Sequence, residues 1–175
     1  MTIALGTEAP RFELPGVDGR DHSLDDYADA HLLVLIQSCN HCPYVQAWEG
    51  RMIDLQREFD DRGVRIVALN SNDAGSHPED SFEEMRARAE REEFNFDYLY
   101  DEPQAIARGL GAERTPEVFV FDRERRLRYH GAIDDSRDEN AVSQRYLRDA
   151  IETLLAGHEP DLTETPPVGC TVKWK

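Results

Sequence analysis

Apolar residues recur along the chain with two different spacings, which predict strands separated by helices. Nearly continuous apolar runs at residues 31–37 and 64–69 are typical of strands that are buried on both faces. Between them, apolar residues recur every three or four positions from Val45 to Phe59, which predicts a helix with one buried stripe. A thinner stripe over residues 78–93 predicts a helix that lies on the surface.

The other segments predict a hairpin near the start of the chain and a second hairpin, a helix and a tail near its end. Asp18-Gly19 is a strong turn signal, and Ser23 caps a short helical turn after it. The later elements are a strand at 96–100, a helix at 104–110, a strand at 115–122 that returns over 127–130, a helix over 142–154, and a Pro- and Thr-rich tail from 157. We therefore expect an α/β fold with a mixed central sheet flanked by helices and an N-terminal β-hairpin extension.

Length and charge limit the interpretation further. At 175 residues the chain suits one domain over 1–157, with a C-terminal tail, 158–175, packed on or near it. The net charge of −16 predicts that nucleic acids and anionic membranes are not partners. All but two of the 20 basic residues are arginines, so the surface suits a halophile, although a GC-rich genome also explains the low lysine content. The first thirty residues are rich in charge and show no signal peptide or membrane anchor, which predicts a cytoplasmic protein.

Two cysteines, Cys39 and Cys42, stand directly after the first apolar strand and open the following helix. Free N–H groups and the helix dipole at such a position favour thiolate over thiol. We expect Cys39 to be the exposed nucleophile and Cys42, one turn later, to resolve the mixed disulfide. His41, which follows Asn40 between the cysteines, is expected to stabilise the thiolate and make the couple more oxidising.

Two alternative roles for the paired cysteines are less favourable. Half of a zinc site would need two more ligands, and only Cys170 and scattered histidines could supply them. A pair of inert buried cysteines is disfavoured by the polar neighbours Ser38, Asn40 and His41. We therefore expect a redox dithiol that needs no metal and no separate cofactor.

Several short stretches resemble a known family when they are taken in order. They are 39–45 (CNHCPYV), 70–73 (NSND), 78–82 (PEDSF), 98–101 (YLYD), 115–116 (TP), 134–137 (DDSR) and 169–175 (GCTVKWK). Together with the order of elements they resemble the thioredoxin fold over nearly the whole chain. More narrowly, the chain resembles peroxiredoxin-like thioredoxin proteins of the alkyl hydroperoxide reductase, thiol-specific antioxidant and TlpA- or ResA-type group.

The resemblance implies a cis proline at Pro116 that faces the dithiol, excludes metals from it and presents the Thr115 backbone to a peptide strand. A trans proline that only opens a strand is the alternative. The chain departs from the family pattern at Ser38, where thioredoxin has tryptophan, and the strand at 31–37 lacks the buried acid that often acts as a base. Arg114 stands where many relatives have a cysteine, and its guanidinium either favours a thiolate at Cys39 or is simply solvated.

Two residues outside the central motif have open roles. Cys170 could be an extra resolving thiol, bridge two subunits, or be buried beside Trp174, and we favour the structural role because no sequence feature brings it near Cys39. His130 closes a strand and is either a surface residue or part of the site lining.

Three functions fit these residues. The first is a thiol-disulfide oxidoreductase that acts on protein or small-molecule disulfides and draws on a thiol reductant system. The second is an antioxidant thiol peroxidase, but the threonine and proline that peroxiredoxins place before their peroxidatic cysteine are replaced by Cys39 and Leu35 ahead of Cys42. The third is a Cu(I) chaperone, for which the cysteine spacing is unsuitable.

Overall fold

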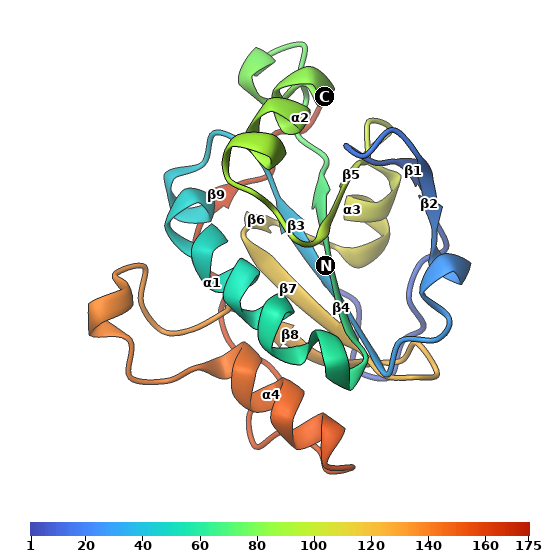
Figure 1. The fold of residues 1–175 in the computed structure, drawn as a ribbon, viewed down its shortest axis with the longest axis vertical. Coiled ribbons are helices and arrows are strands. Elements are labelled where there is room, and N and C mark those ends of the chain that lie inside the picture. The colour runs from blue at the N-terminus through green and yellow to red at the C-terminus, as the bar shows by residue number, and fades with distance from the viewer.

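A five-stranded mixed sheet forms the centre of the computed structural model, which describes residues 1–175 (Figure 1). Its strands are β3 (Leu32–Ser38), β4 (Val64–Asn70), β5 (Asp97–Tyr100), β7 (Glu117–Phe121) and β8 (Leu127–Gly131), in the spatial order β5-β4-β3-β7-β8. β3, β4 and β5 run parallel, while β7 is antiparallel to both β3 and β8. The sheet therefore has one parallel and one antiparallel side, and β3 lies at its centre.

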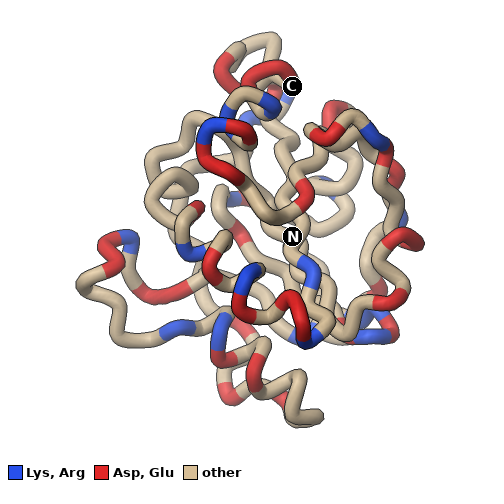
Figure 2. The backbone as a smooth tube through the Cα atoms, in the orientation of Figure 1, with Lys and Arg blue, Asp and Glu red and all other residues tan.

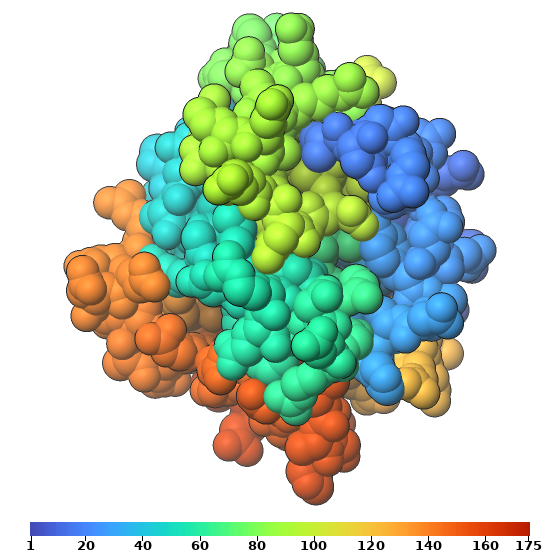
Figure 3. All heavy atoms as spheres, viewed as in Figure 1, coloured from blue at the N-terminus to red at the C-terminus, as the bar shows by residue number.

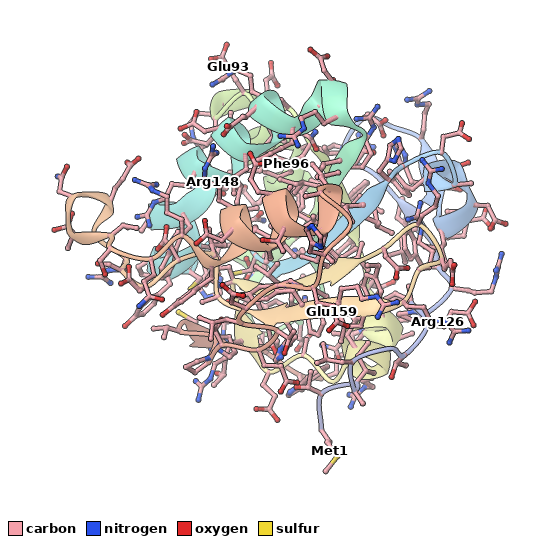
Figure 4. The ribbon with its side chains drawn as sticks, turned by 90° about the horizontal axis from the view of Figure 1, so that it is seen from below. Met1, Glu93, Phe96, Arg126, Arg148 and Glu159 are labelled. Carbon is pink, nitrogen blue, oxygen red and sulfur yellow. The ribbon has the colours of Figure 1, made fainter.

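Helices cover both faces of this sheet. They are α1 (Pro43–Phe59), α2 (Phe82–Arg91), α3 (Ala105–Leu110) and α4 (Tyr146–Leu155), with short 3₁₀ turns at Leu24–Tyr27, Asp60–Arg62, Pro78–Asp80 and Glu139–Ala141. One hydrophobic core lies under α1, α2 and α4, and a second lies under α3 and the N-terminal hairpin. Figure 4 shows α1 and α4 on one side of the strands and α3 on the other, and in Figure 3 the segments of α1 and α2 form the face toward the viewer, with that of α4 at its lower edge.

The apolar run of β3 follows from its contacts on both faces. Val34 and Ile36 pack into the core beneath α1, whereas Leu33 and Leu35 pack into the core beneath α3. All four side chains are fully buried. Because alternate residues of a strand point to opposite faces, a strand covered on both sides needs an apolar residue at every position.

Two small sheets stand beside the central one. The N-terminal hairpin pairs β1 (Glu13–Pro15) with β2 (Asp21–Ser23), and Gly19 in its turn has the left-handed φ of +85° that favours glycine. The second small sheet pairs β6 (Arg114–Thr115) with β9 (Cys170–Thr171), which comes from the C-terminal tail. In this pair Thr115 lies opposite Cys170, so the C-terminal tail lies beside the segment that leads into β7.

A buried ion pair fixes α1 to the segment that follows β8. The Arg51 guanidinium contacts the Asp134 carboxylate at 2.7 Å, and both side chains are almost completely buried. The Trp48 indole N–H donates to the same carboxylate at 2.8 Å, and Arg51 also donates to the carbonyl of Ser136. Both charged groups therefore have hydrogen-bond partners, as buried charges require, and only the Arg51 Nε is left without one.

The expected α/β architecture, with its mixed sheet and N-terminal hairpin, is confirmed. Three elements differ from expectation. The helix expected over 78–93 is interrupted at Ser81, whose side chain accepts a hydrogen bond from the Glu84 N–H and so caps α2. The last helix begins at Tyr146 rather than at 142. The strand expected over 115–122 divides at Pro116, which has no N–H to donate.

Charged residues are spread over the helices and loops rather than gathered on one element, as Figure 2 shows. None of the helices combines the length and the apolar character that crossing a membrane requires.

Candidate active site

Cys39 and Cys42 lie where β3 ends and α1 begins. Cys42 is the N-cap residue of α1, and Pro43 occupies the first helical position, where its missing N–H has no intrahelical partner to lose. Cys39 is 1% exposed and Cys42 is 0% exposed. The expectation that Cys39 is exposed is therefore wrong for this conformation, because other segments cover both sulfurs.

One of the covering segments contains the cis peptide bond between Thr115 and Pro116, as the family resemblance implies. The Thr115 carbonyl oxygen lies 3.4 Å from the Cys42 Sγ, and its hydroxyl oxygen lies 3.7 Å from the Cys39 Sγ. Thr115 therefore contacts both sulfurs of the pair. Arg114, its neighbour, has an exposed side chain and contributes its backbone to the pairing with β9.

The other covering segment is the C-terminal tail. Its Cys170 Sγ lies 2.6 Å from the Cys42 Sγ, and Cys170 is only partly buried. No sequence feature placed Cys170 beside the dithiol, and our preference for a remote structural position is wrong about where this residue lies. The contact depends on the pairing of β9 with β6, which are more than fifty residues apart in the sequence. A strand of two residues is too short to show a periodic pattern, so this pairing could not be predicted.

Asp80 organises the loop between the two cysteines, and the sequence patterns did not identify it. Its carboxylate is fully buried and accepts the backbone N–H groups of Asn40 at 2.7 Å and His41 at 3.2 Å. The Asn72 side-chain amide donates to its other oxygen at 2.9 Å. The Asn40 side chain in turn accepts from the Tyr98 hydroxyl at 2.7 Å. The loop is thus held by an acid from the 3₁₀ turn before α2.

The His41 side chain contacts the Asp80 carboxylate, whereas the sequence led us to expect that it stabilises the thiolate. Its Nδ1 lies against the Asp80 carboxylate, and its ring stacks on His77 with 5.5 Å between centroids. One ligand atom each from Cys39, His41 and Asp80 lies within 4.8 Å of the others, so the three groups are close enough to share a metal ion. The Asp80 oxygens, however, are already used by three N–H donors, so these residues fit a hydrogen-bonded loop better than a metal centre.

The two thiols have opposite tendencies to ionise. The pKa of Cys42 is lowered to about 4, mainly by a hydrogen bond from Cys39. Burial alone would raise this pKa, and further hydrogen bonds from Cys170 and the Val45 backbone help to offset that effect. The pKa of Cys39 is raised by the hydrogen bond to Cys42, by burial and by the nearby charge of Asp80. Burial and the hydrogen bond to Cys42 raise the pKa of Cys170 to about 11. These shifts favour the thiolate on Cys42 rather than on Cys39, the residue that the sequence patterns indicate as the nucleophile.

A buried acid does stand near the site, but it comes from β7 rather than from β3. Glu117 follows the cis proline, is 1% exposed, and accepts the backbone N–H groups of Glu113 and Arg114. Its other oxygen is 2.7 Å from the His130 Nε2. His130 is therefore a buried partner of Glu117, and the surface position that we considered for it is wrong.

The fold and the cysteine pair beside a cis proline define a thioredoxin-fold protein, and more distantly related thioredoxin-fold chains also superpose on it. A family model described as AhpC/TSA family matches residues 5–130. The chain therefore belongs to the AhpC/TSA family.

Individual relatives carry this comparison further. The chain is similar to "Thiol-disulfide oxidoreductase ResA" of Geobacillus thermodenitrificans, with 26% identity over 123 residues, which are 69% of this chain but only 65% of that protein. A hypothetical protein from Sinorhizobium meliloti superposes with a TM-score of 0.94 at 36% identity and covers 100% of this chain and 97% of its own. An uncharacterized conserved protein from Geobacillus kaustophilus gives a TM-score of 0.93 at 39% identity, over 98% and 93% of the two chains.

Proposed function

We propose that this protein is a thiol-disulfide oxidoreductase that cycles between a Cys39–Cys42 dithiol and the corresponding disulfide. The observation that carries the proposal is the cysteine pair at the start of α1, where Cys42 is the N-cap residue and Thr115, which precedes the cis proline, contacts both sulfurs. The similarity to a relative named a thiol-disulfide oxidoreductase supports the same class. Its substrates would be protein or small-molecule disulfides, and a thiol reductant would return it to the dithiol.

The proposed order of attack is the reverse of the one expected from the sequence. Cys42 attacks a sulfur of the client disulfide and releases the other client sulfur as a thiol, and Cys39 then attacks Cys42 and releases the second client thiol. Two observations support this order. The lowered pKa of Cys42 favours its thiolate, and the sulfur of Cys170, on a strand paired with Thr115, contacts Cys42 rather than Cys39.

The order can be tested by trapping the mixed disulfide. Cys39→Ser and Cys42→Ser are each made in a Cys170→Ser background, incubated with oxidised glutathione and analysed by mass spectrometry of the intact protein. The Cys39→Ser protein is expected to accumulate glutathione on Cys42, because the resolving thiol is missing, and the Cys42→Ser protein is expected to remain unmodified. Trapping only on Cys39 would restore the order expected from the sequence.

The same experiment also tests the class of reaction. Cys170→Ser alone serves as the control, because it retains both members of the proposed dithiol. It is expected to form the Cys39–Cys42 disulfide and to release reduced glutathione. Failure to form this disulfide over the whole range of glutathione potentials would refute the proposed function.

Thiol peroxidase activity is the second candidate, favoured by the same lowered pKa of Cys42. A thiolate at a helix N-terminus can attack a peroxide, which leaves a sulfenic acid that a neighbouring thiol converts to a disulfide. Consumption of hydrogen peroxide that is lost in Cys42→Ser and retained for one turnover in Cys39→Ser would support it. A rate no faster than that of free cysteine would exclude it.

A further inference from the structure

The last seven residues of the chain, Gly169–Lys175, form a docked segment on the dithiol, here called the C-terminal strap. Its β9 strand pairs with β6, and the Val172 N–H donates to the Glu113 carbonyl at 3.0 Å. Beyond β9, the Lys173 N–H donates to the Asn72 side chain at 2.9 Å, and its carbonyl accepts from the Asp73 backbone at 2.8 Å. The strap is thus fixed by backbone hydrogen bonds along most of its length.

Side-chain contacts hold the outer end of the strap. The Arg108 guanidinium lies over the Trp174 ring, 4.6 Å from its centroid. The Gln104 side chain donates to the Lys173 carbonyl at 3.0 Å and accepts from the Lys175 N–H at 3.2 Å. These contacts with α3 and its N-cap residue, Gln104, hold the strap in the position that brings Cys170 to Cys42.

Gly169 shows that the approach of the strap to the cis-proline segment leaves no room for a side chain. A Cβ atom added at Gly169 would lie 2.0 Å from the Thr115 carbonyl oxygen and 3.2 Å from the Pro116 nitrogen. Both are backbone atoms, which cannot rotate away as the end of a side chain can. Docking of the strap therefore requires glycine at this position.

The strap lies on the backbone edge that a peptide substrate would use. A bound peptide adds a strand to an exposed edge, and the edge beside the dithiol is β6, which here already pairs with β9. The same N–H and C=O groups cannot pair with two strands at once. A client disulfide therefore reaches Cys42 only while the strap is undocked, and the strap can return only after the client has left.

From this arrangement, and on the basis of the proposed function, we infer that Cys170 is a third redox thiol that takes over the disulfide from Cys39. After the client has left, the Cys170 thiolate attacks the Cys42 sulfur of the Cys39–Cys42 disulfide. The Cys42–Cys170 bond forms, the Cys39–Cys42 bond breaks, and the electron pair leaves on Cys39 as a thiolate, which takes up the proton lost by Cys170. No oxidant or reductant is consumed, because one disulfide replaces another.

The consequence is that oxidation moves from a fully buried pair to a segment near the surface. Cys39 is enclosed by the fold, whereas Cys170 is only partly buried and lies within five residues of Lys175. The Cys42–Cys170 disulfide is therefore the form that the thiol reductant meets. It also joins the strap covalently to the site and keeps a second client out until reduction has taken place.

The test uses the complete chain, equilibrated in glutathione buffers of different potential, quenched in acid, alkylated and mapped by peptide mass spectrometry. Wild-type protein is expected to show both disulfides, Cys39–Cys42 and Cys42–Cys170. The total fraction of protein that carries either disulfide should follow the glutathione potential. The ratio of the Cys42–Cys170 form to the Cys39–Cys42 form should stay constant, because the exchange between them transfers no electrons. Absence of the Cys42–Cys170 disulfide, or a ratio that changes with potential, would overturn the inference.

Gly169→Ala separates docking from thiol chemistry, because it removes no sulfur. It is expected to reduce the share of the Cys42–Cys170 disulfide by about tenfold or more, the factor expected from a steric cost of about 1.4 kcal/mol. Gly50→Ala on α1 is the matched control and should leave that share unchanged, because a Cβ there meets no atom within 4 Å. An unchanged share in Gly169→Ala would contradict the assigned role of the strap.

Two further variants keep the test decisive. Val172→Pro removes the N–H that bonds to Glu113 and should lower the share of the Cys42–Cys170 disulfide as Gly169→Ala does. Cys170→Ser should retain the Cys39–Cys42 disulfide. If it does while wild type lacks the Cys42–Cys170 disulfide, the inference about the strap fails and the proposed function stands. If Cys170→Ser forms no disulfide, the proposed function itself fails.

Discussion

The buried carboxylate of Asp80 allows a quantitative test of how the loop between the cysteines is held. Asp80→Ala removes the acceptor for three N–H donors, which belong to the backbones of Asn40 and His41 and to the Asn72 side chain, and it also removes the carboxylate that contacts the His41 ring. Asp80→Asn is the more informative companion. Both backbone donors bind the same oxygen, Oδ1, whereas the Asn72 amide binds Oδ2, so an asparagine can keep two of the three hydrogen bonds.

The expected loss of stability follows from these contacts. Leaving a buried donor without a partner costs about 1–3 kcal/mol. For three such donors we expect Asp80→Ala to lower the free energy of unfolding by about 3–5 kcal/mol. This is the lower part of the range that three separate costs would give, because water can enter beside His41 and bind a freed donor. Asp80→Asn brings its NH₂ group against the two groups that contact Oδ2, so it loses the hydrogen bond from the Asn72 amide and the charged partner of the His41 ring, for a cost of about 1–3 kcal/mol.

Urea denaturation of the fully reduced proteins measures both values. Glu79→Gln, one residue away on the exposed side of the same turn, is the control and should change the free energy of unfolding by no more than about 0.5 kcal/mol. The order Asp80→Ala, then Asp80→Asn, then Glu79→Gln is the predicted ranking of the losses. An Asp80→Ala protein as stable as the control, or an Asp80→Asn protein less stable than Asp80→Ala, would refute the role assigned to this carboxylate.

Two further predictions concern the buried ion pair and the thiolate. Asp134→Ala leaves the Arg51 guanidinium buried without its carboxylate and should cost about 3–5 kcal/mol in urea denaturation, and a loss below about 1 kcal/mol would contradict the burial of the pair. The reduced protein should keep its ultraviolet thiolate absorbance down to a midpoint of about pH 4, and Cys39→Ala should raise that midpoint, because the hydrogen bond from Cys39 contributes most to the lowered pKa of Cys42. Because folding lowers this pKa, the thiolate stabilises the fold fully above its unfolded pKa of about 8.5, and that stabilisation is lost as the pH falls toward 4. A midpoint that Cys39→Ala leaves unchanged would exclude the hydrogen bond as the cause.

The architecture was predictable because long elements carry strong periodic patterns. The β3 and β4 strands are covered on both faces and therefore read as continuous apolar runs, and α1 shows the three-and-four spacing of a helix with one buried stripe. Ser81 was misplaced inside a longer helix, although serine followed three residues later by glutamate is a known signature of a helix start. Here the local signal existed and the apolar pattern was given too much weight.

The site was predictable in part. The position of Cys39 and Cys42 before a helix and the cis bond at Pro116 could be inferred from motifs. The roles of Asp80 and Cys170 could not, because each depends on a contact between segments that are distant in sequence and carry no periodic pattern. The ionisation of the two thiols could not be predicted either. A helix N-terminus favours a thiolate, but which sulfur holds it depends on the hydrogen bonds around each one.

The most direct test of dithiol exchange is an equilibrium titration of Cys170→Ser protein against glutathione, with the free thiols of Cys39 and Cys42 counted by alkylation and mass spectrometry. We predict that both thiols disappear together in one reversible two-electron transition, with no stable glutathione adduct at its midpoint. Thiols that disappear independently of each other, or that persist under fully oxidising conditions, would contradict the function proposed for this site.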